Sequence, residues 1–241
     1  MNTWENDACW VTKRNGVYYL NSHESDYATS DNIYGPYTYR GRFWSDAYSD
    51  HGTFFTYHNQ TYFTYGVPEN WGEEPVDRFY RTTKIIYAHY RDNGEIVCDP
   101  FIKEAGVAQY DARWDEIKSV WYFAASDELY KKETADGFEM RGIRNGSYLC
   151  YPHVANMRQN ALLFLDITPD KPCEIEIRES SPFGHVLGCC RVPGKAPSGT
   201  AAQVECRLEN TYGSHDLCLV FRGEGKELFR FKGFRFEQVK D

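Results

Sequence analysis

One acidic residue near the start of the chain stands where it could act as a proton donor. Asp7 precedes a pair of small residues and Trp10, and two strand-like segments joined at Asn15-Gly16 follow. A carboxyl group held beside a strand can serve as a general acid when its surroundings tune its pKa. The simpler alternative is a polar residue ahead of a β-hairpin. The choice depends on what the other residues build around Asp7.

Composition narrows the class of partner. The 241 residues are 41% hydrophobic and 17% aromatic, and the formal net charge is -8. This balance supports real hydrophobic cores and argues against nucleic acid or an anionic membrane as a partner, whereas a neutral ligand such as a sugar fits it better. No apolar run has the character of a signal peptide or the length of a membrane span. The chain as written is therefore expected in the cytoplasm, and a secreted or periplasmic location stays open for a longer parent.

The cysteines indicate packing rather than metal binding. None of the eight forms a CxxC pair, and no histidine lies at zinc-finger spacing, which argues against a structural zinc site. Several lie in apolar strand patterns such as SYLCYP and DLCLVF, where a free cysteine behaves as a small hydrophobe. We expect buried thiols rather than a disulfide framework.

Short alternating segments separated by turn residues predict an all-β chain. Segments such as GVYYLNSH and CEIEIRES are punctuated by Asn-Gly, Gly-Pro and Pro-Gly. Asn15 and Asn59 are 44 residues apart, as are Tyr18 and Tyr62. A repeat of about 40–50 residues with a hairpin in each copy is typical of β-propeller blades, and two unrelated hairpins are the alternative. Tyr-rich hairpins give way to sandwich-like strands near Trp114, which predicts a domain boundary within 105–113, with domains 1–108 and 109–241.

Four stretches of the first half resemble the C-terminal part of glycoside hydrolase family 43. Members of that family are five-bladed β-propellers that cut arabinose- or xylose-containing glycans with inversion. The stretches are DACWVTKRNGVYYL, YATSDNIYGPYTYRG, SDHGTFFTYHNQTYFTYG and RTTKIIYAHYRDNGEIV. The resemblance covers roughly residues 5–105 and implies the last blades of such an enzyme, of β-xylosidase or α-arabinofuranosidase type.

The second half resembles carbohydrate-binding module family 6, a β-sandwich. GSHDLCLVFRGEGKELFRFKGFRFEQ is the most specific stretch, and IRNGSYLCYPHV and CEIEIRESSPFGHVLGCCRVPG fall where the family has its early strands and central glycine-rich turn. The match covers about residues 114–238. The expected fold is thus all-β, a partial β-propeller of about two blades followed by a jelly-roll-like β-sandwich.

The first resemblance places Asp7 at the general-acid position, where the family has Glu. Inverting glycosidases hold two carboxyl groups about 6.5–9.5 Å apart. Asp is one methylene shorter, and a displacement of about 1 Å can cost about 100-fold in rate. Glu5 is the alternative acid, although it requires a two-residue shift that breaks the match at Trp10. The family's base and pKa-tuning Asp come from blades that precede this stretch, so we expect the chain alone to lack hydrolytic activity.

Three further residues match substrate-binding or axial positions of the family 43 propeller. His51 and Arg81 match the His and Arg directed towards the propeller axis, and Trp10 accompanies them. In the family the His helps hold a central cation or water, and the Arg supports the carboxylates. The alternatives are a hydrogen-bonded strand-end histidine and a charge on a strand face.

The sugar-binding positions of the second half depart from the family 6 pattern. Arg141 falls about where a stacking Tyr is expected, and Arg230 replaces an Asn. Lys232 and Gly233 replace the nearby Asp and Trp, and no tryptophan follows Trp121. The sandwich is therefore either a degenerate module with a structural role or a module that binds glycan at the family's other, concave-face site.

Calcium binding in that family would rest on an early Glu and a late Asp. The match puts Val120 and Lys232 at these positions, and a hard cation needs oxygen ligands. We therefore expect no metal and no other cofactor. Three remaining aromatic residues of this half are expected to pack in strands rather than to serve as sugar platforms: Tyr148, Tyr151 and Tyr212.

Three functions remain open. The chain is an enzyme piece that needs complementing blades, a stand-alone carbohydrate-binding protein, or an inactive gene remnant. The expected ligands are plant cell-wall glycans of the arabinoxylan or arabinan type, with no nucleic acid and no membrane. The expected protein partner is a missing N-terminal propeller part or a second copy of the chain, because an open propeller exposes strand edges.

The purified chain should show no turnover of aryl α-arabinofuranoside or aryl β-xyloside above an Asp7→Asn control. The physical reason is that inversion needs a second carboxylate to activate water. Release of the aryl group measured by absorbance tests this expectation. Turnover that disappears in Asp7→Asn would contradict it.

Overall fold

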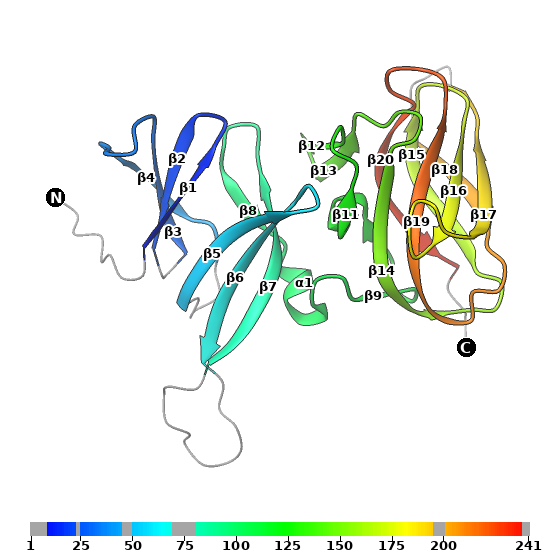
Figure 1. Cartoon of the computed structure of the whole chain (residues 1–241), viewed down its shortest axis with the longest axis horizontal. Coiled ribbons are helices and arrows are strands. Elements are labelled where there is room, and N and C mark those ends of the chain that lie inside the picture. Colours follow the sequence, from blue (N-terminus) through cyan, green and yellow to red (C-terminus); the bar gives the residue numbers. More distant parts are fainter. Residues whose placement is uncertain (1–8, 23–24, 45–49, 69–80, 195–200, 238–241) are drawn as a thin grey trace, which may run out of the picture. The chain divides into compact units, whose positions relative to one another are not determined.

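The computed structural model describes residues 9–22, 25–44, 50–68, 81–194 and 201–237. The regular secondary structure of these residues is almost entirely β-strand, which confirms the all-β class (Figure 1). The described helical segments are α1 (Pro100–Ala105) and the 3-10 turn η1 (Ser119–Trp121), and neither has the length and apolar character needed to cross a membrane. The chain divides into two compact units, the first comprising Met1–Thr56 and Thr61–Gly106 and the second Tyr57–Gln60 and Val107–Asp241.

The first unit consists of two four-stranded antiparallel sheets, each with its strands in sequence order. This is the up-and-down arrangement of propeller blades. The first sheet contains β1 (Trp10–Arg14), β2 (Val17–Asn21), β3 (Asp26–Ser30) and β4 (Thr38–Arg42). The second contains β5 (Asp50–Tyr57), β6 (Gln60–Pro68), β7 (Arg81–Tyr90) and β8 (Ile96–Cys98).

The 44-residue repeat corresponds to equivalent positions in the two sheets. Asn15 lies in the β1–β2 turn and Asn59 in the β5–β6 turn, with φ angles of 48° and 63°. Asparagine tolerates this left-handed conformation better than most residues, and it is the conformation that two-residue hairpins require. Tyr18 and Tyr62 follow in β2 and β6.

An aromatic cluster forms the core of the first unit. Phe63 lies at its centre and packs against Phe43 and Phe54, with ring centroids 5.0 and 4.9 Å away. Gly52 is required beside it, because a Cβ atom there would lie 2.5 Å from the Phe63 ring. The two sheets are thus held together mainly by ring packing, which buries large apolar area.

The second unit contains two sheets of paired strands. One sheet has the order β12-β13-β20-β15-β18, with β10 added to β20, and the other has the order β11-β14-β19-β16-β17, with β9 added to β14. The strands of the first sheet are β10 (Ile117–Lys118), β12 (Tyr130–Thr134), β13 (Gly137–Arg141), β15 (Leu162–Pro169), β18 (Ala202–Arg207) and β20 (Phe229–Phe236). Those of the second are β9 (Tyr110–Asp111), β11 (Ala124–Ala125), β14 (Tyr148–Met157), β16 (Cys173–Glu179), β17 (Val186–Val192) and β19 (Gly213–Gly223).

Aromatic side chains join the two sheets of the second unit. Tyr151 packs against Phe234 at 4.9 Å, and Phe221 packs against Phe229 at 5.2 Å. Side chains alternate along each strand, so the residues one position before or after these core residues on the same strand face outward. The turn Tyr57–Gln60 also belongs to this unit, and the Gln60 amide donates to the carbonyl oxygens of Val120 and Tyr122 at 2.9 and 2.8 Å.

Two cysteines differ from the expectation of buried thiols. Cys150 and Cys218, in the segments SYLCYP and DLCLVF, form a disulfide between β14 and β19. They are directly opposite each other in the antiparallel register, which brings their side chains together on one face. The expectation was wrong at these positions because local sequence does not reveal which strand lies beside which. The remaining cysteines are free, and four of them are buried: Cys98, Cys173, Cys190 and Cys206.

Replacing Cys150 and Cys218 with alanine should lower the free energy of unfolding of the second unit by about 2–4 kcal/mol, because the bond closes a long loop in the unfolded chain. The two residues are 68 apart in sequence. Thermal unfolding with and without reductant measures the effect. Reductant should lower the melting temperature of the wild type and leave the double variant unchanged. Equal melting of both proteins under oxidising conditions would contradict this prediction.

Candidate functional site

The predicted catalytic position lies just before the described part of the chain. Asp7 is outside the described residues, so its role as general acid remains a prediction. Trp10, the first residue of β1, is half-buried and packs against Phe54 and Phe63 at 6.2 and 6.1 Å. The ring thus forms part of the aromatic core, and its proposed contact with substrate is also still a prediction.

Buried polar atoms without partners gather along β1 and β2. Trp10 pairs with Asn21 in the β1–β2 register. The Trp10 indole nitrogen, the Thr12 hydroxyl and both amide atoms of Asn21 are buried without a hydrogen-bond partner in the described part of the chain. Buried polar groups are nearly always hydrogen-bonded to protein or water. These strands therefore offer donors and acceptors that a water molecule or a ligand would satisfy.

His51 and Arg81 lie at one end of the second sheet. His51 is the second residue of β5 and Arg81 the first of β7. These strands flank β6, and Arg81 pairs with Pro68 at its end, so the two backbone positions share one end of the sheet. His51 is exposed and has a φ of 52°, a conformation in which a strand residue is strained. The Arg81 side chain is outside the described part.

In the second unit, the structure brings Arg141 and Arg230 together. Met140 pairs with Phe231, which places the next residues, Arg141 on β13 and Arg230 on β20, at neighbouring positions. Two cations on adjacent strands repel each other unless an anion lies between them. The neighbouring carboxylate of Glu227 provides that anion.

Glu227 forms a two-pronged ion pair with Arg141. The Arg141 Nε and Nη2 atoms donate to the two Glu227 carboxylate oxygens at 2.7 and 2.9 Å. Nη1 donates to Glu139 at 3.2 Å, and the Gly142 amide donates to Glu227 at 3.1 Å. The hydrogen bonds from Arg141 hold the pKa of Glu227 below its usual value. We call this set of Arg141, Glu139 and Glu227 the arginine lock; sequence patterns revealed neither glutamate.

The two predicted calcium positions offer no oxygen ligand. The Val120 side chain is buried hydrocarbon, and the Lys232 ammonium group forms an ion pair with Asp136 at 2.6 Å. These residues do not fit a hard divalent cation. Among the described residues, no three His, Cys, Asp or Glu side chains are grouped so that they could hold a metal ion.

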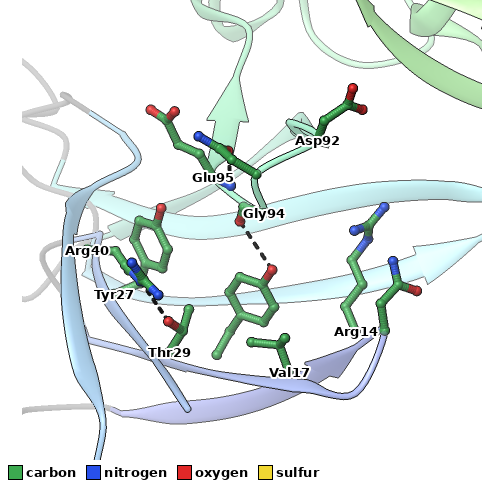
Figure 2. Close-up of a pocket in the computed structure, with 11 residues that line it drawn as sticks. Arg14, Val17, Tyr27, Thr29, Arg40, Asp92, Gly94 and Glu95 are labelled. Carbon is green, nitrogen blue, oxygen red and sulfur yellow. Dashed lines mark hydrogen bonds between the residues drawn. The ribbon is translucent and has the colours of Figure 1, made fainter. Parts of the chain in front are cut away.

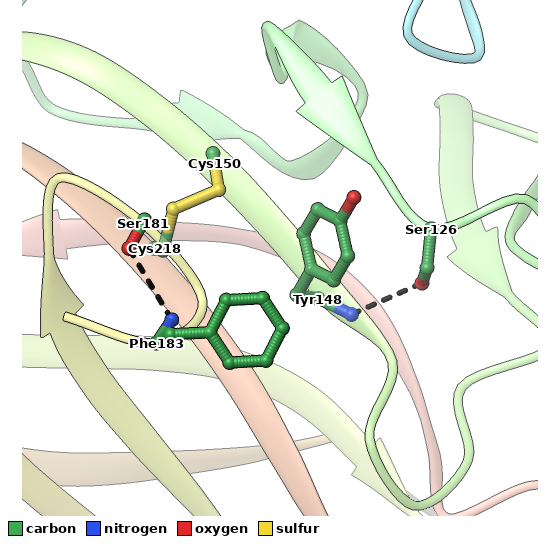
Figure 3. Close-up of a disulfide and its surroundings, with 6 residues drawn as sticks. All are labelled: Ser126, Tyr148, Cys150, Ser181, Phe183 and Cys218. Atoms are coloured by element: carbon green, nitrogen blue, oxygen red, sulfur yellow. Dashed lines mark hydrogen bonds between the residues drawn. A yellow bond between two sulfur atoms is a disulfide. The ribbon is translucent and has the colours of Figure 1, made fainter.

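The outer side of the β14–β19–β16 sheet carries the disulfide beside an aromatic residue. Tyr148 lies opposite Val220, two residues along β14 from the Cys150–Cys218 pair. Since side chains alternate and Leu149 is fully buried, Tyr148 and the disulfide share the outer face. Figure 3 shows Tyr148, whose amide donates to Ser126 Oγ at 3.1 Å, among the surroundings of the disulfide.

A loop after β16 adds an exposed ring to this face. Phe183 is 93% exposed, and Figure 3 shows it near the disulfide. The loop is held by Arg178, which lies opposite Cys218 in the β16–β19 pairing and donates to the Gly184 carbonyl at 2.8 Å. Glu176 accepts hydrogen bonds from Arg178 and Arg222 at 2.9 and 3.0 Å. We call Tyr148, Phe183, Glu176, Arg178 and Arg222 the outer face.

The three tyrosines expected to pack in strands behave differently from one another. Tyr151 is fully buried in the sandwich core, as expected, and Tyr148 is half-buried. Tyr212 is 78% exposed, so the expectation was wrong there. It lies in the loop before β19, where alternation along a strand does not determine its orientation.

Comparison with known proteins supports both resemblances. Residues 122–238 match the family model of carbohydrate binding module (family 6). An arabinoxylan arabinofuranohydrolase of Paenibacillus polymyxa is 23% identical over 245 residues, which cover 89% of this chain and 38% of that protein. The corresponding enzyme of Bacillus subtilis (strain 168) is 24% identical over 257 residues, covering 94% of this chain and 50% of that protein. The chain thus spans half or less of these relatives.

A solved structure shows the same fold. The crystal structure of a glycoside hydrolase family 43 arabinoxylan arabinofuranohydrolase from Bacillus subtilis, in complex with cellotetraose, matches 96% of this chain and 54% of that chain. The TM-score is 0.51 and the identity 19%. The chain is therefore homologous, over most of its length, to family 43 arabinoxylan arabinofuranohydrolases, and its second unit carries the match to carbohydrate-binding module family 6.

Proposed function

We propose that this chain is a part of a glycoside hydrolase for arabinoxylan-type plant cell-wall polysaccharide that is inactive by itself, and that its second unit binds the polysaccharide. The observation that carries the proposal is the homology to arabinoxylan arabinofuranohydrolases through both units, joined with the family 6 match over 122–238. In the first unit, the motifs place Asp7 at the proton-donor position and His51 and Arg81 at positions directed towards the propeller axis, and these residues would take up their roles only when the remaining blades are supplied.

The arginine lock disfavours sugar binding between β13 and β20. A sugar would need hydrogen-bond donors and an aromatic face there. The Arg141 Nε, Nη1 and Nη2 atoms already donate to carboxylates, and the sequence match predicts Arg141 at the position of the family's stacking ring. Displacing Glu227 would remove two of the three carboxylate hydrogen bonds of Arg141 and leave only Glu139 beside it, at a cost that a neutral sugar hydroxyl does not recover.

The outer face supports sugar binding better. An exposed ring such as Phe183 is costly to leave in water and is suited to packing against the C–H face of a sugar. Tyr148 adds a second ring, and Arg222, which among the described residues is hydrogen-bonded to Glu176 through Nε alone, keeps its terminal N–H groups for a sugar hydroxyl. Fixed polar groups beside rings bind sugars at a low cost in conformational entropy. We propose the outer face as the polysaccharide-binding surface.

Phe183→Ala and Tyr148→Ala should each weaken binding of soluble arabinoxylan by about tenfold, since each removes one stacking ring. Affinity electrophoresis or calorimetry on the whole chain measures this. Tyr212→Ala is the matched control, because Tyr212 is also an exposed aromatic residue and lies in the loop before β19, outside the outer face. Equal losses in all three variants, or no binding by the wild type, would favour a purely structural module.

Glu227→Gln should lower the free energy of unfolding by about 2 kcal/mol at pH 7, because it weakens charged hydrogen bonds of a group only 26% exposed. The pKa of Glu227 is lower in the folded state than in the unfolded chain. The stabilisation of the fold by ionised Glu227 is therefore fully present above the unfolded pKa of about 4.3, and it is lost as the pH falls through the folded pKa. Denaturant unfolding at pH 7 and pH 3 tests both points. Glu224→Gln, at an exposed glutamate, should have little effect. An undiminished difference at pH 3 would contradict the ionic nature of the lock.

A further inference from the structure

A pocket in the first unit lies outside all the predicted site residues. It has a volume of about 430 Å³, which is in the range of small-ligand sites. Its walls come from the β1–β2 turn, from strands β2 to β4 and from the β7–β8 turn (Figure 2). Segments that are far apart in the sequence therefore create it.

The floor of the pocket is rigid. Tyr19 and Tyr27 are both buried, and their rings stack with centroids 6.3 Å apart. The Tyr19 hydroxyl donates to the Gly94 carbonyl at 3.1 Å, which ties β2 to the β7–β8 turn. Gly94 has a φ of +84°, and a Cβ atom there would lie 2.9 Å from the Tyr19 hydroxyl, so glycine permits this approach. The pocket is thus formed before any ligand arrives.

Two arginines line opposite sides of the pocket without an acidic partner. Figure 2 shows Arg14 on one side and Arg40 on the other. The Arg14 guanidinium lies 4.3 Å over the Tyr90 ring, and Arg40 Nε donates to Thr29 Oγ1 at 2.7 Å. Neither guanidinium has an ion pair with any residue in the described ranges. Both therefore keep terminal N–H donors oriented for an acceptor, and a carboxylate is the acceptor that matches a guanidinium best.

The upper rim carries two carboxylates. Asp92 and Glu95 line the pocket from the β7–β8 turn (Figure 2). Glu95 is fixed by Arg91, whose Nε lies 3.4 Å from its carboxylate. These carboxylates would repel a phosphate dianion but accept hydrogen bonds from hydroxyl groups. The pocket thus combines cations for one carboxylate with acceptors for several hydroxyls.

We propose that this pocket binds a sugar acid, a hydroxyl-rich ring that carries one carboxylate. The carboxylate is held by Arg40 or Arg14, and the ring hydroxyls bond to the acceptors of the rim. This site is additional to the proposed polysaccharide-binding face, because every residue that lines it belongs to the first unit.

Calorimetry on the whole chain with D-glucuronate, D-galacturonate and D-glucose tests the proposal. We expect a sugar acid to bind and glucose to bind at least about tenfold more weakly, since charged hydrogen bonds are lost. Arg40→Gln and Arg14→Gln should each weaken sugar-acid binding about tenfold. Arg42→Gln is the matched control, because Arg42 lies on the same strand, pairs with Asp26 and changes the net charge equally. Binding should also weaken as salt is raised.

Three outcomes would overturn the proposal: glucose binding as tightly as the sugar acids, equal loss in Arg40→Gln and Arg42→Gln, or no binding of either sugar acid. Amide chemical shifts of the wild type provide a readout that needs no variant. The Asn93 and Gly94 amides should shift on addition of the bound sugar acid and not on addition of glucose. Shifts confined to other residues would place the ligand elsewhere and contradict the assignment of this pocket.

Discussion

Alternation of side chains along paired strands is the constraint on which the rest of this structure depends. In β19, Leu217, Leu219 and Phe221 fill the interior, and this commits Cys218 and Arg222 to the outer face. A shift of one residue in the pairing of β19 would turn all three of these apolar side chains out of the core, so burial of the core fixes the strand register. The same strand therefore anchors the sandwich, supplies half of the disulfide and contributes to the outer face. The binding surface that we propose for the second unit uses the positions that the core leaves free.

Arg141 of the arginine lock and the neighbouring Arg230 lie at positions where the sequence match predicts that the family's sugar-contacting residues are replaced. Arg141 and Arg230 lie on neighbouring strands, so their positive charges require a nearby anion. Glu227, in the segment just before β20, provides a carboxylate. An ion pair that is only partly exposed, and whose atoms are already hydrogen-bonded, is costly to break for a neutral ligand. The polysaccharide surface that we propose lies on the opposite sheet, where the ion pairs lie beside the exposed ring of Phe183 and the half-buried ring of Tyr148.

Local sequence predicts the strands and turns but not the contacts between distant segments. Asn15-Gly16 and the turn at Gly94 are recognisable because tight hairpins need left-handed residues, and the expectation that Tyr151 packs in a strand agrees with its full burial. The Cys150–Cys218 bond joins residues 68 apart, and the Tyr19–Gly94 hydrogen bond joins residues 75 apart. Such pairs depend on strand order and register, which local patterns do not specify. For the same reason the lock, the exposed ring of the β16–β17 loop and the pocket of the first unit became visible only in the structure.

Amide chemical-shift mapping with a soluble arabinoxylan oligosaccharide would show which surface of the second unit holds the polysaccharide. Saturable shifts should appear at Tyr148, Phe183 and Gly184, while the side-chain Nε signal of Arg141 stays unchanged. These residues lie on the outer face and its loop, and Arg141 lies in the lock on the other sheet. Saturable shifts at Arg141 and Arg230 with none on the outer face would contradict the proposed binding surface. The absence of any saturable shift would leave the second unit with a structural role alone.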